Sequence, residues 1–272
     1  MPLTVASESL AVRKLRRRAR RAIRWPWAQW LAPEPETIVR VPPFDDAFVA
    51  AVKLIAPQYT DYGGDEESRR KWQRDQNRSC WGEDTALVHL LRVMPPPRRV
   101  LEIGAGLGRS AVFFSKRYFP DARFDLFDAT GADTKYELMG NRYDDSFCGN
   151  LAVLQQCLDF NGVSNVSLVD AAQTGGRVPM PDERYDFIYS FYSVGFHWSI
   201  DHWLDEILAV AKPTALCAFI VPSHYQPSRR VAAMPHMLIE GAPLLQPDPY
   251  STTYVLVFTP QPAAWFQGAT RE

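Results

Sequence analysis

One run of residues, Val100 to Ser110, constrains the fold more than any other part of the sequence. It reads VLEIGAGLGRS, an apolar strand pattern that passes through three glycines into a helix pattern. Glycines permit a sharp turn and let backbone approach a ligand without interference from a Cβ atom. The run therefore predicts a strand, a tight turn and a helix, with a ligand site at the turn.

Alternating strand and helix patterns surround this run. Strands are predicted at 98–103, 123–127, 166–169, 185–191, 215–221 and 253–258, and helices at 109–118, 149–160 and 202–211. Strands that alternate with helices form parallel βαβ units, whose crossovers cover both faces of a sheet. We therefore predict an α/β domain with a mostly parallel sheet.

The spacing of the glycines indicates which class of cofactor the turn would bind. A dinucleotide fingerprint reads G-x-G-x-x-G, but its third glycine would fall on Arg109, and the actual spacing is G-x-G-x-G. With Glu102, two residues before the first glycine, the run resembles motif I of the class I S-adenosylmethionine-dependent methyltransferases, E/D-x-G-x-G-x-G. The resemblance implies a Rossmann-like methyltransferase fold with a seven-stranded sheet, and a cofactor bound by Glu102, Gly104, Gly106 and Gly108. The carboxylate would face the cofactor's methionine amino group; NAD is the lower-ranked alternative because its pyrophosphate would be repelled.

Further acidic residues end the next predicted strands. Asp128 closes FDLFD about twenty residues beyond the glycines, where a carboxylate can accept both ribose hydroxyls. Asp125 is a competing candidate, but it lies within the strand. The resemblance also implies that Asp170 meets the adenine amino group with Ala171 beside the ring, and that Ser190 belongs to the cofactor site. The alternative is that these aspartates only cap loops.

The segment after the fourth predicted strand bears on the acceptor. A catechol methyltransferase of the metal-dependent type would have an aspartate where this chain has Ser190, and the Asn-Pro-Pro-aromatic signature of nucleic-acid amino methylation is absent. The stretch FYSVGFHWSIDHW is similar to the S-x-G-F-H-[YW]-x-[IVL] segment of bacterial sugar O-methyltransferases that act in polysaccharide pathways. This resemblance implies a carbohydrate hydroxyl as acceptor, and mycobacterial methylmannose polysaccharide biosynthesis is a narrower option within it.

His197 in that stretch is the predicted general base. It follows a strand on the same sheet edge as the glycine turn, and a neutral histidine can take a proton from a poorly acidic hydroxyl. Asp186 starts that strand and should therefore face the opposite edge. Trp198 beside His197, and His224 in VPSHYQP, are predicted to contact the acceptor. A purely structural role for either histidine is the alternative.

The segment from 58 to 84 is polar yet rich in aromatic residues, between predicted helices at 45–56 and 83–93. We interpret it as a lid or substrate wall that presents Tyr59, Tyr62 and Trp72 to the acceptor. The alternative is that these rings cover the core.

The predicted organisation is a basic, Pro/Trp-rich arm at 1–44, a helical lid at 45–96, the methyltransferase domain at 97–260 and a tail at 261–272. The arm carries the arginine-rich run VRKLRRRARRAIR at 12–24, which is either a solvated extension or a docking segment.

Composition limits the remaining options. Net charge is -1, the four cysteines form no CxxC pair, and no apolar run is long enough for a membrane span. We expect a cytoplasmic enzyme that does not bind nucleic acid and does not span a membrane; homodimerisation and a divalent metal are left open. A methyltransferase for a polyketide, macrolide or lipid-linked acceptor and a non-catalytic cofactor-binding scaffold are the rival functions.

Overall fold

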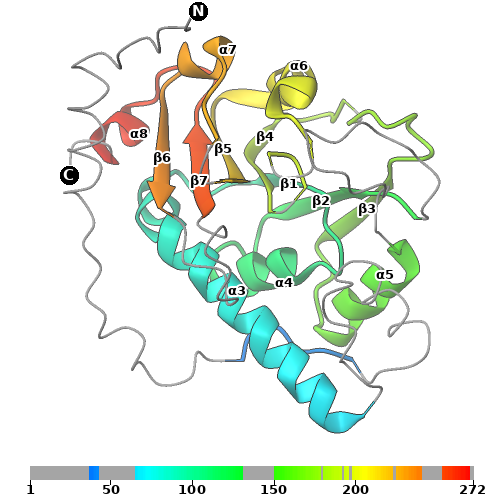
Figure 1. Ribbon diagram of the computed structural model, residues 1–272. Helices are drawn as coiled ribbons and strands as arrows, with labels where there is room; N and C mark the ends of the chain where they lie inside the picture. The colour runs from blue at the N-terminus through cyan, green and yellow to red at the C-terminus, as the bar shows by residue number, and fades with distance from the viewer. Residues whose placement is uncertain are drawn as a thin grey trace, which may run out of the picture. The chain divides into compact units, whose positions relative to one another are not determined.

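The computed structural model describes residues 37–42, 65–130, 150–178, 180–191, 193–195, 198–222, 225–240 and 253–269. Within these ranges a seven-stranded sheet has the order β3-β2-β1-β4-β5-β7-β6 (Figure 1). The strands are β1 (Arg99–Ile103), β2 (Arg123–Asp128), β3 (Val166–Asp170), β4 (Tyr185–Ser190), β5 (Ala211–Pro222), β6 (His236–Glu240) and β7 (Thr253–Phe258). All pairs among β1 to β5 are parallel, and β7 runs antiparallel to β5 and β6. The predicted mostly parallel, Rossmann-like sheet is confirmed.

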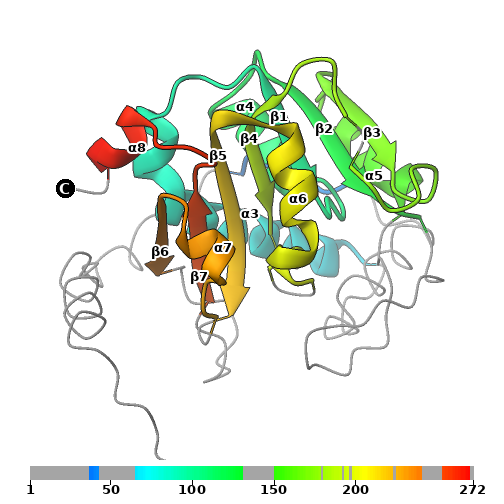
Figure 2. The same ribbon diagram turned by 90° about the horizontal axis from the view of Figure 1, so that it is seen from above.

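Helices cover both faces of this sheet (Figure 2). The first face packs against α3 (Glu66–Val93), α4 (Arg109–Arg117), α5 (Leu151–Phe160) and α8 (Ala264–Ala269), and the second against α6 (Ile200–Val210) and α7 (Arg229–Ala232). Side chains of a strand alternate between faces. Val100 therefore joins the first apolar cluster, whereas Leu101 and Ile103 join the second.

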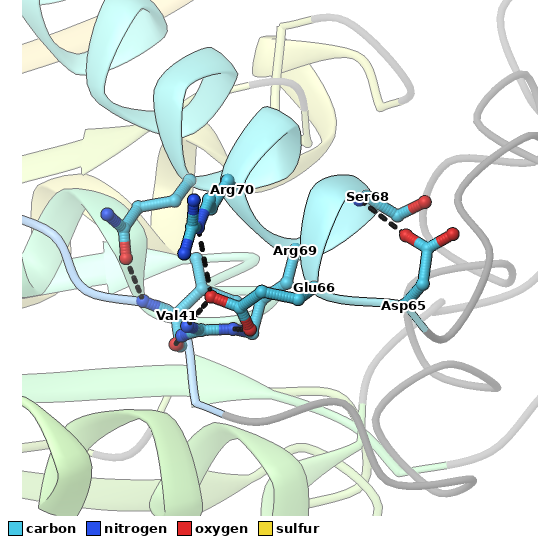
Figure 3. A network of polar contacts seen from close by, with 7 residues as sticks. Val41, Asp65, Glu66, Ser68, Arg69 and Arg70 are labelled. Atoms are coloured by element: carbon cyan, nitrogen blue, oxygen red, sulfur yellow. Dashed lines mark hydrogen bonds and ion pairs between the residues drawn. The ribbon is translucent and has the colours of Figure 1, made fainter.

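Helix α3 corrects one prediction. The sequence pattern predicts a lid segment up to residue 84 and a helix from 83, but the helix already begins at Glu66. Asp65 caps it by accepting a hydrogen bond from the Ser68 amide at 2.7 Å, and Glu66 pairs with Arg69 and Arg70 along the first turn (Figure 3). The polar residues of the run are good helix formers, and only a narrow apolar stripe faces the core. Such a sparse stripe does not reveal a helix in the sequence.

Two further differences concern the late strands. Strand β5 begins at Ala211 rather than 215, and β6 was not located from the sequence. Among the described residues, strand β6 pairs only with β7, and its short pattern follows Pro235. A short strand at the edge of a sheet forms its backbone hydrogen bonds with one neighbouring strand only. Its sequence pattern is therefore weak. The predicted helix at 45–56 lies outside the described residues.

Candidate active site

The glycine turn joins β1 to α4, and two of its three glycines have different surroundings. Gly104 donates its N–H to the Phe127 carbonyl at 2.8 Å, and a Cβ atom there would lie 2.3 Å from the Ser193 Cβ. Gly106 has a positive φ of +57°, yet a Cβ built on it meets nothing within 4 Å among the described residues. Packing within the protein thus requires Gly104 to lack a side chain, whereas the open side of Gly106 leaves room for a ligand.

Asp128 at the end of β2 faces this turn. Its Oδ2 accepts a hydrogen bond from the Gly106 amide at 2.6 Å and its Oδ1 one from the Ala129 amide at 2.8 Å. The residue is only 4% exposed, and burial raises its pKa to about 6 despite the two amide donors. An ionised carboxylate has about four acceptor sites, so two amide donors leave capacity for ligand hydroxyls.

Asp125, the competing candidate on the same strand, is held by the protein itself. It forms an ion pair with Arg99 and accepts a hydrogen bond from the Tyr185 hydroxyl at 2.8 Å. These partners come from the first residues of β1 and β4, at the amino ends of the strands. The geometry therefore favours Asp128 over Asp125 as a ligand-binding carboxylate.

Glu102 lies directly before the turn and is buried, with 2% of its surface exposed. The Tyr189 hydroxyl donates to its Oε2 at 2.9 Å, and in the described part of the chain no cationic side chain lies within ion-pair distance. Burial raises the pKa of Glu102 to about 8, against the lowering influence of Tyr189. A buried carboxyl group without a cationic partner is unfavourable in its charged form, so this position suits a ligand that brings a positive charge.

The ends of β3 and β4 complete the edge. Asp170 accepts a hydrogen bond from the Ala172 amide at 2.9 Å, and Ala171 is buried with its amide donating to the Asp128 carbonyl at 2.7 Å. The Ser190 hydroxyl donates to the Ile103 carbonyl at 2.6 Å and accepts from the Val194 amide at 2.8 Å. Ser190 therefore ties β4 to β1, and both of these contacts are with the protein's own backbone.

The carboxyl ends of β1, β2, β3 and β4 lie side by side in the sheet order. From β1 the chain proceeds to β2 and β3 on one side and later returns to β4 on the other. Ligands of open α/β sheets bind at such a point of reversal, outside the carboxyl ends of the strands. Topology thus brings Glu102, the glycine turn, Asp128 and Asp170 to one edge.

The predicted acceptor residues are only partly described. His197, His224, Tyr59 and Tyr62 lie outside the described residues. Trp198 is half-buried, with its ring centroid 6.0 Å from that of His202 in a stacked orientation.

Trp72 lies within α3 and is 3% exposed. Trp81, further along the same helix, packs edge-on against Phe113 of the core. For these two tryptophans of α3 the structure thus describes buried or half-buried rings, which is the core-covering alternative.

Four residues around the start of α4 and beside Glu102 were not predicted from the sequence. Arg109 of α4 forms a buried ion pair with Glu83 of α3, and its Nη1 lies 3.6 Å from the Cys80 sulfur. The α3 side chains carry no sequence signal, because the polar pattern of their segment is typical of a loop. Tyr189 could have been inferred, since it directly opposes Glu102 on the adjacent strand.

Two kinds of feature are absent from the described ranges. No helix there has both the length and the apolar character to cross a membrane. No group of three or more histidine, cysteine, aspartate or glutamate side chains in the same ranges is arranged to hold a metal ion.

Comparisons with known proteins find solved structures alone. No protein-family model matches the chain, and no curated protein does. A SAM-dependent methyltransferase from Aquifex aeolicus aligns over 65% of this chain and 88% of its own, with 15% identity and a TM-score of 0.44. The O-methyltransferase TomG from Streptomyces achromogenes, involved in tomaymycin synthesis, aligns over 79% and 90%, with 15% identity and a TM-score of 0.43. At these identities and TM-scores the likeness carries no further conclusion about this chain.

Proposed function

We propose that this chain is an S-adenosylmethionine-dependent methyltransferase. One observation carries the proposal: the adjacent strands β1, β2 and β3 each have a carboxylate residue at or next to their carboxyl end, beside a glycine turn that is open at Gly106. Bound there, S-adenosylmethionine would supply an electrophilic methyl group. Its parts match the edge in order, with an ammonium group for Glu102, ribose hydroxyls for Asp128 and the adenine amino group for Asp170.

The fit is chemical as well as spatial. Glu102 is buried without a cationic partner among the described residues, so an ammonium group would stabilise its charged form. Asp128 keeps acceptor capacity beyond its two amide donors. Ala171 offers an apolar surface beside the position proposed for the adenine ring. A dinucleotide would instead bring its pyrophosphate toward these carboxylates, which repel it.

We further propose that the acceptor is a carbohydrate hydroxyl and that His197 is the general base. The supporting observations are the sequence FYSVGFHW after β4 and Ser190 in place of an aspartate at the end of that strand. His197 would remove the hydroxyl proton as the new bond to carbon forms, while the site holds both reactants in line. Trp198, His224, Tyr59 and Tyr62 are the proposed acceptor contacts.

Two measurements test this proposal in sequence. Isothermal titration calorimetry with S-adenosylhomocysteine and with NAD identifies the cofactor, and we expect binding of the first only. Transfer of labelled methyl groups is then measured on mannosides, other sugars and non-sugar aglycones. Tight NAD binding without a response to S-adenosylhomocysteine would overturn the cofactor assignment. Transfer to aglycones alone would replace the carbohydrate by a small-molecule acceptor.

A further inference from the structure

Ser193 follows strand β4 and covers one side of the glycine turn. A Cβ atom built on Gly104 would lie 2.3 Å from the Ser193 Cβ and 2.5 Å from its Oγ. The Ser193 side chain therefore occupies the space that a side chain at position 104 would need. Around Gly106, by contrast, no described atom lies within 4 Å of a Cβ built in the same way. The turn is thus closed by Ser193 at its first glycine and open at its second.

One hydroxyl group links Ser193 to the start of the glycine turn. The Ser190 hydroxyl donates to the Ile103 carbonyl at 2.6 Å and accepts from the Val194 amide at 2.8 Å. Ser190 itself is fully buried. Ile103 directly precedes Gly104, and Val194 directly follows Ser193. The two contacts of this hydroxyl therefore hold Ser193 against the glycine turn.

The residues after Ser193 are also held from the side of strand β5. Gly195 has a φ of +94°, and a Cβ built on it would lie 2.8 Å from the Ile220 carbonyl oxygen. Its amide donates to the Trp198 carbonyl at 2.7 Å, and the Trp198 amide donates to the Ser193 carbonyl at 3.1 Å. These contacts within the protein fix Ser193 relative to the glycine turn, and such preorganisation favours ligand binding.

The amides of the glycine turn are already engaged. The Gly104 and Gly108 amides donate to backbone carbonyls at 2.8 Å, and the Gly106 amide donates to Asp128 at 2.6 Å. The Ser193 hydroxyl, in contrast, is half-buried and has no hydrogen-bond partner among the described residues. It is therefore a hydrogen-bond donor beside the turn that a ligand can use.

The proposed cofactor has one group that the site described above does not yet bind. Its ammonium group, ribose and adenine are assigned to Glu102, Asp128 and Asp170, all of which are carboxyl residues. The carboxylate of its aminoacyl end needs donors instead, and negative charges repel it. This carboxylate and the ammonium group are attached to the same carbon atom. It must therefore bind close to Glu102, at the end of the turn that contains Gly104.

We propose that Ser193 is a further cofactor-binding residue, whose hydroxyl donates to the carboxylate of the cofactor's aminoacyl end, and that Ser190 is the positioning residue that holds it there. This inference rests on the proposed function, because it concerns the same cofactor. It gives Ser190, which the sequence analysis assigns to the cofactor site, an indirect role through Ser193.

The test compares two ligands that differ only in the carboxylate. They are S-adenosylhomocysteine and its decarboxylated analogue, which keeps the ammonium group, and calorimetry gives the Kd of each. Ser193→Ala should weaken binding of S-adenosylhomocysteine about tenfold, because a hydrogen bond to a charged group is lost. The Kd of the decarboxylated analogue should not change. Ser190→Ala should show the same selective loss, and the double variant should lose no more than Ser193→Ala alone, since both act through one contact.

Ser115→Ala is the matched control. Ser115 is a buried serine of helix α4, and its hydroxyl donates to the Asn165 Oδ1 at 3.2 Å. Its replacement removes a buried hydroxyl that contacts neither Ser193 nor the glycine turn. The Kd of both ligands should therefore equal that of the wild type.

Two outcomes overturn the inference separately from the proposed function. If the wild type binds S-adenosylhomocysteine and Ser193→Ala binds it equally well, the hydroxyl does not contact the cofactor. If Ser193→Ala weakens both ligands by the same factor, the hydroxyl does not recognise the carboxylate. Absence of any S-adenosylhomocysteine binding by the wild type would instead remove the proposed function. Ser193→Ala removes a half-buried hydroxyl only, so it decides the question even if Ser190→Ala fails to fold.

Discussion

The carboxyl groups at the amino ends of the parallel strands and those at the carboxyl ends have different partners. Toward the amino ends of the strands, Asp125 pairs with Arg99, and Asp186 accepts from the Arg98 and Arg99 amides and pairs with Lys212. At the carboxyl ends, Glu102 and Asp128 are buried and accept hydrogen bonds only from a tyrosine hydroxyl or from backbone amides within the described residues.

This difference distinguishes structural carboxyl groups from those available to a ligand. An aspartate paired with a buried arginine already has its charge compensated, and the protein loses stability when the pair is broken. A buried carboxyl group that receives only neutral donors has a raised pKa and gains from an incoming cation. Substitutions at the carboxyl ends of strands β1 to β4 should therefore affect function more than stability.

The largest expected effect contrasts two histidines. His197→Gln should lower methyl transfer about 100-fold with cofactor affinity unchanged, because general base catalysis is lost. His236→Gln, at the amino end of β6 and with its ring nitrogen 2.9 Å from the Met234 carbonyl, should retain native turnover. Single-turnover rates measure both. Native turnover of His197→Gln across pH 6 to 9 would transfer the base to His224 or to an aspartate.

Two aspartates of strand β2 give the next contrast. Asp128→Ala should weaken S-adenosylhomocysteine binding by about 2 to 3 kcal/mol, since two hydroxyls lose a charged acceptor. Asp125→Ala should leave the affinity unchanged but destabilise the fold by about 3 kcal/mol, because the partly buried Arg99 loses its partner. Calorimetry and chemical denaturation of both variants separate the effects. Equal affinities for the two variants would contradict the division between the edges.

A smaller effect separates two glycines of like geometry. Gly106 and Gly162 have φ values of +57° and +67°, and a Cβ on either meets nothing within 4 Å in the described residues. Alanine at each should cost about 1 to 2 kcal/mol of stability for its left-handed backbone. Only Gly106→Ala should also weaken cofactor binding, about tenfold, because its methyl group occupies the space proposed for the ligand. A tenfold loss in Gly162→Ala as well would place the cause in the backbone.

The arrangement at the carboxyl ends of the strands was predictable, because the sequence patterns that indicate it are local. The strand, glycine turn and helix around residues 100–110 are contiguous, and parallel strands bring their carboxyl ends together wherever the chain alternates with helices. Asp186 was correctly assigned to the opposite edge on the same reasoning, since it follows the first residue of β4.

The partners across the fold were not predictable in this way. The contact of Arg109 with Glu83 joins residues that are distant in sequence, and its partner lies on a helix whose polar surface hid its length. In the described part of the chain, β7 is the only strand that pairs with β6. The identity of a buried partner is set by tertiary packing, about which local patterns carry no information.

The smallest expected effect concerns stability and pH at the carboxyl edge itself. Burial raises the pKa of Glu102 from 4.5 in the unfolded chain to about 8 in the folded one. The folded state therefore holds this proton more tightly, so the stabilisation is complete below pH 4.5 and is lost as pH rises toward 8.

Glu102→Gln keeps an acceptor for the Tyr189 hydroxyl and cannot ionise. Without cofactor, its melting temperature at pH 8 should exceed that of the wild type, and the difference should shrink as the pH falls and disappear below pH 4.5. Asp125→Asn, at a carboxyl group that is already paired, should lower the melting temperature at both pH values. A constant difference between Glu102→Gln and the wild type from pH 5 to 8 would show that Glu102 is ionised in the cofactor-free protein and that the two edges do not differ in charge.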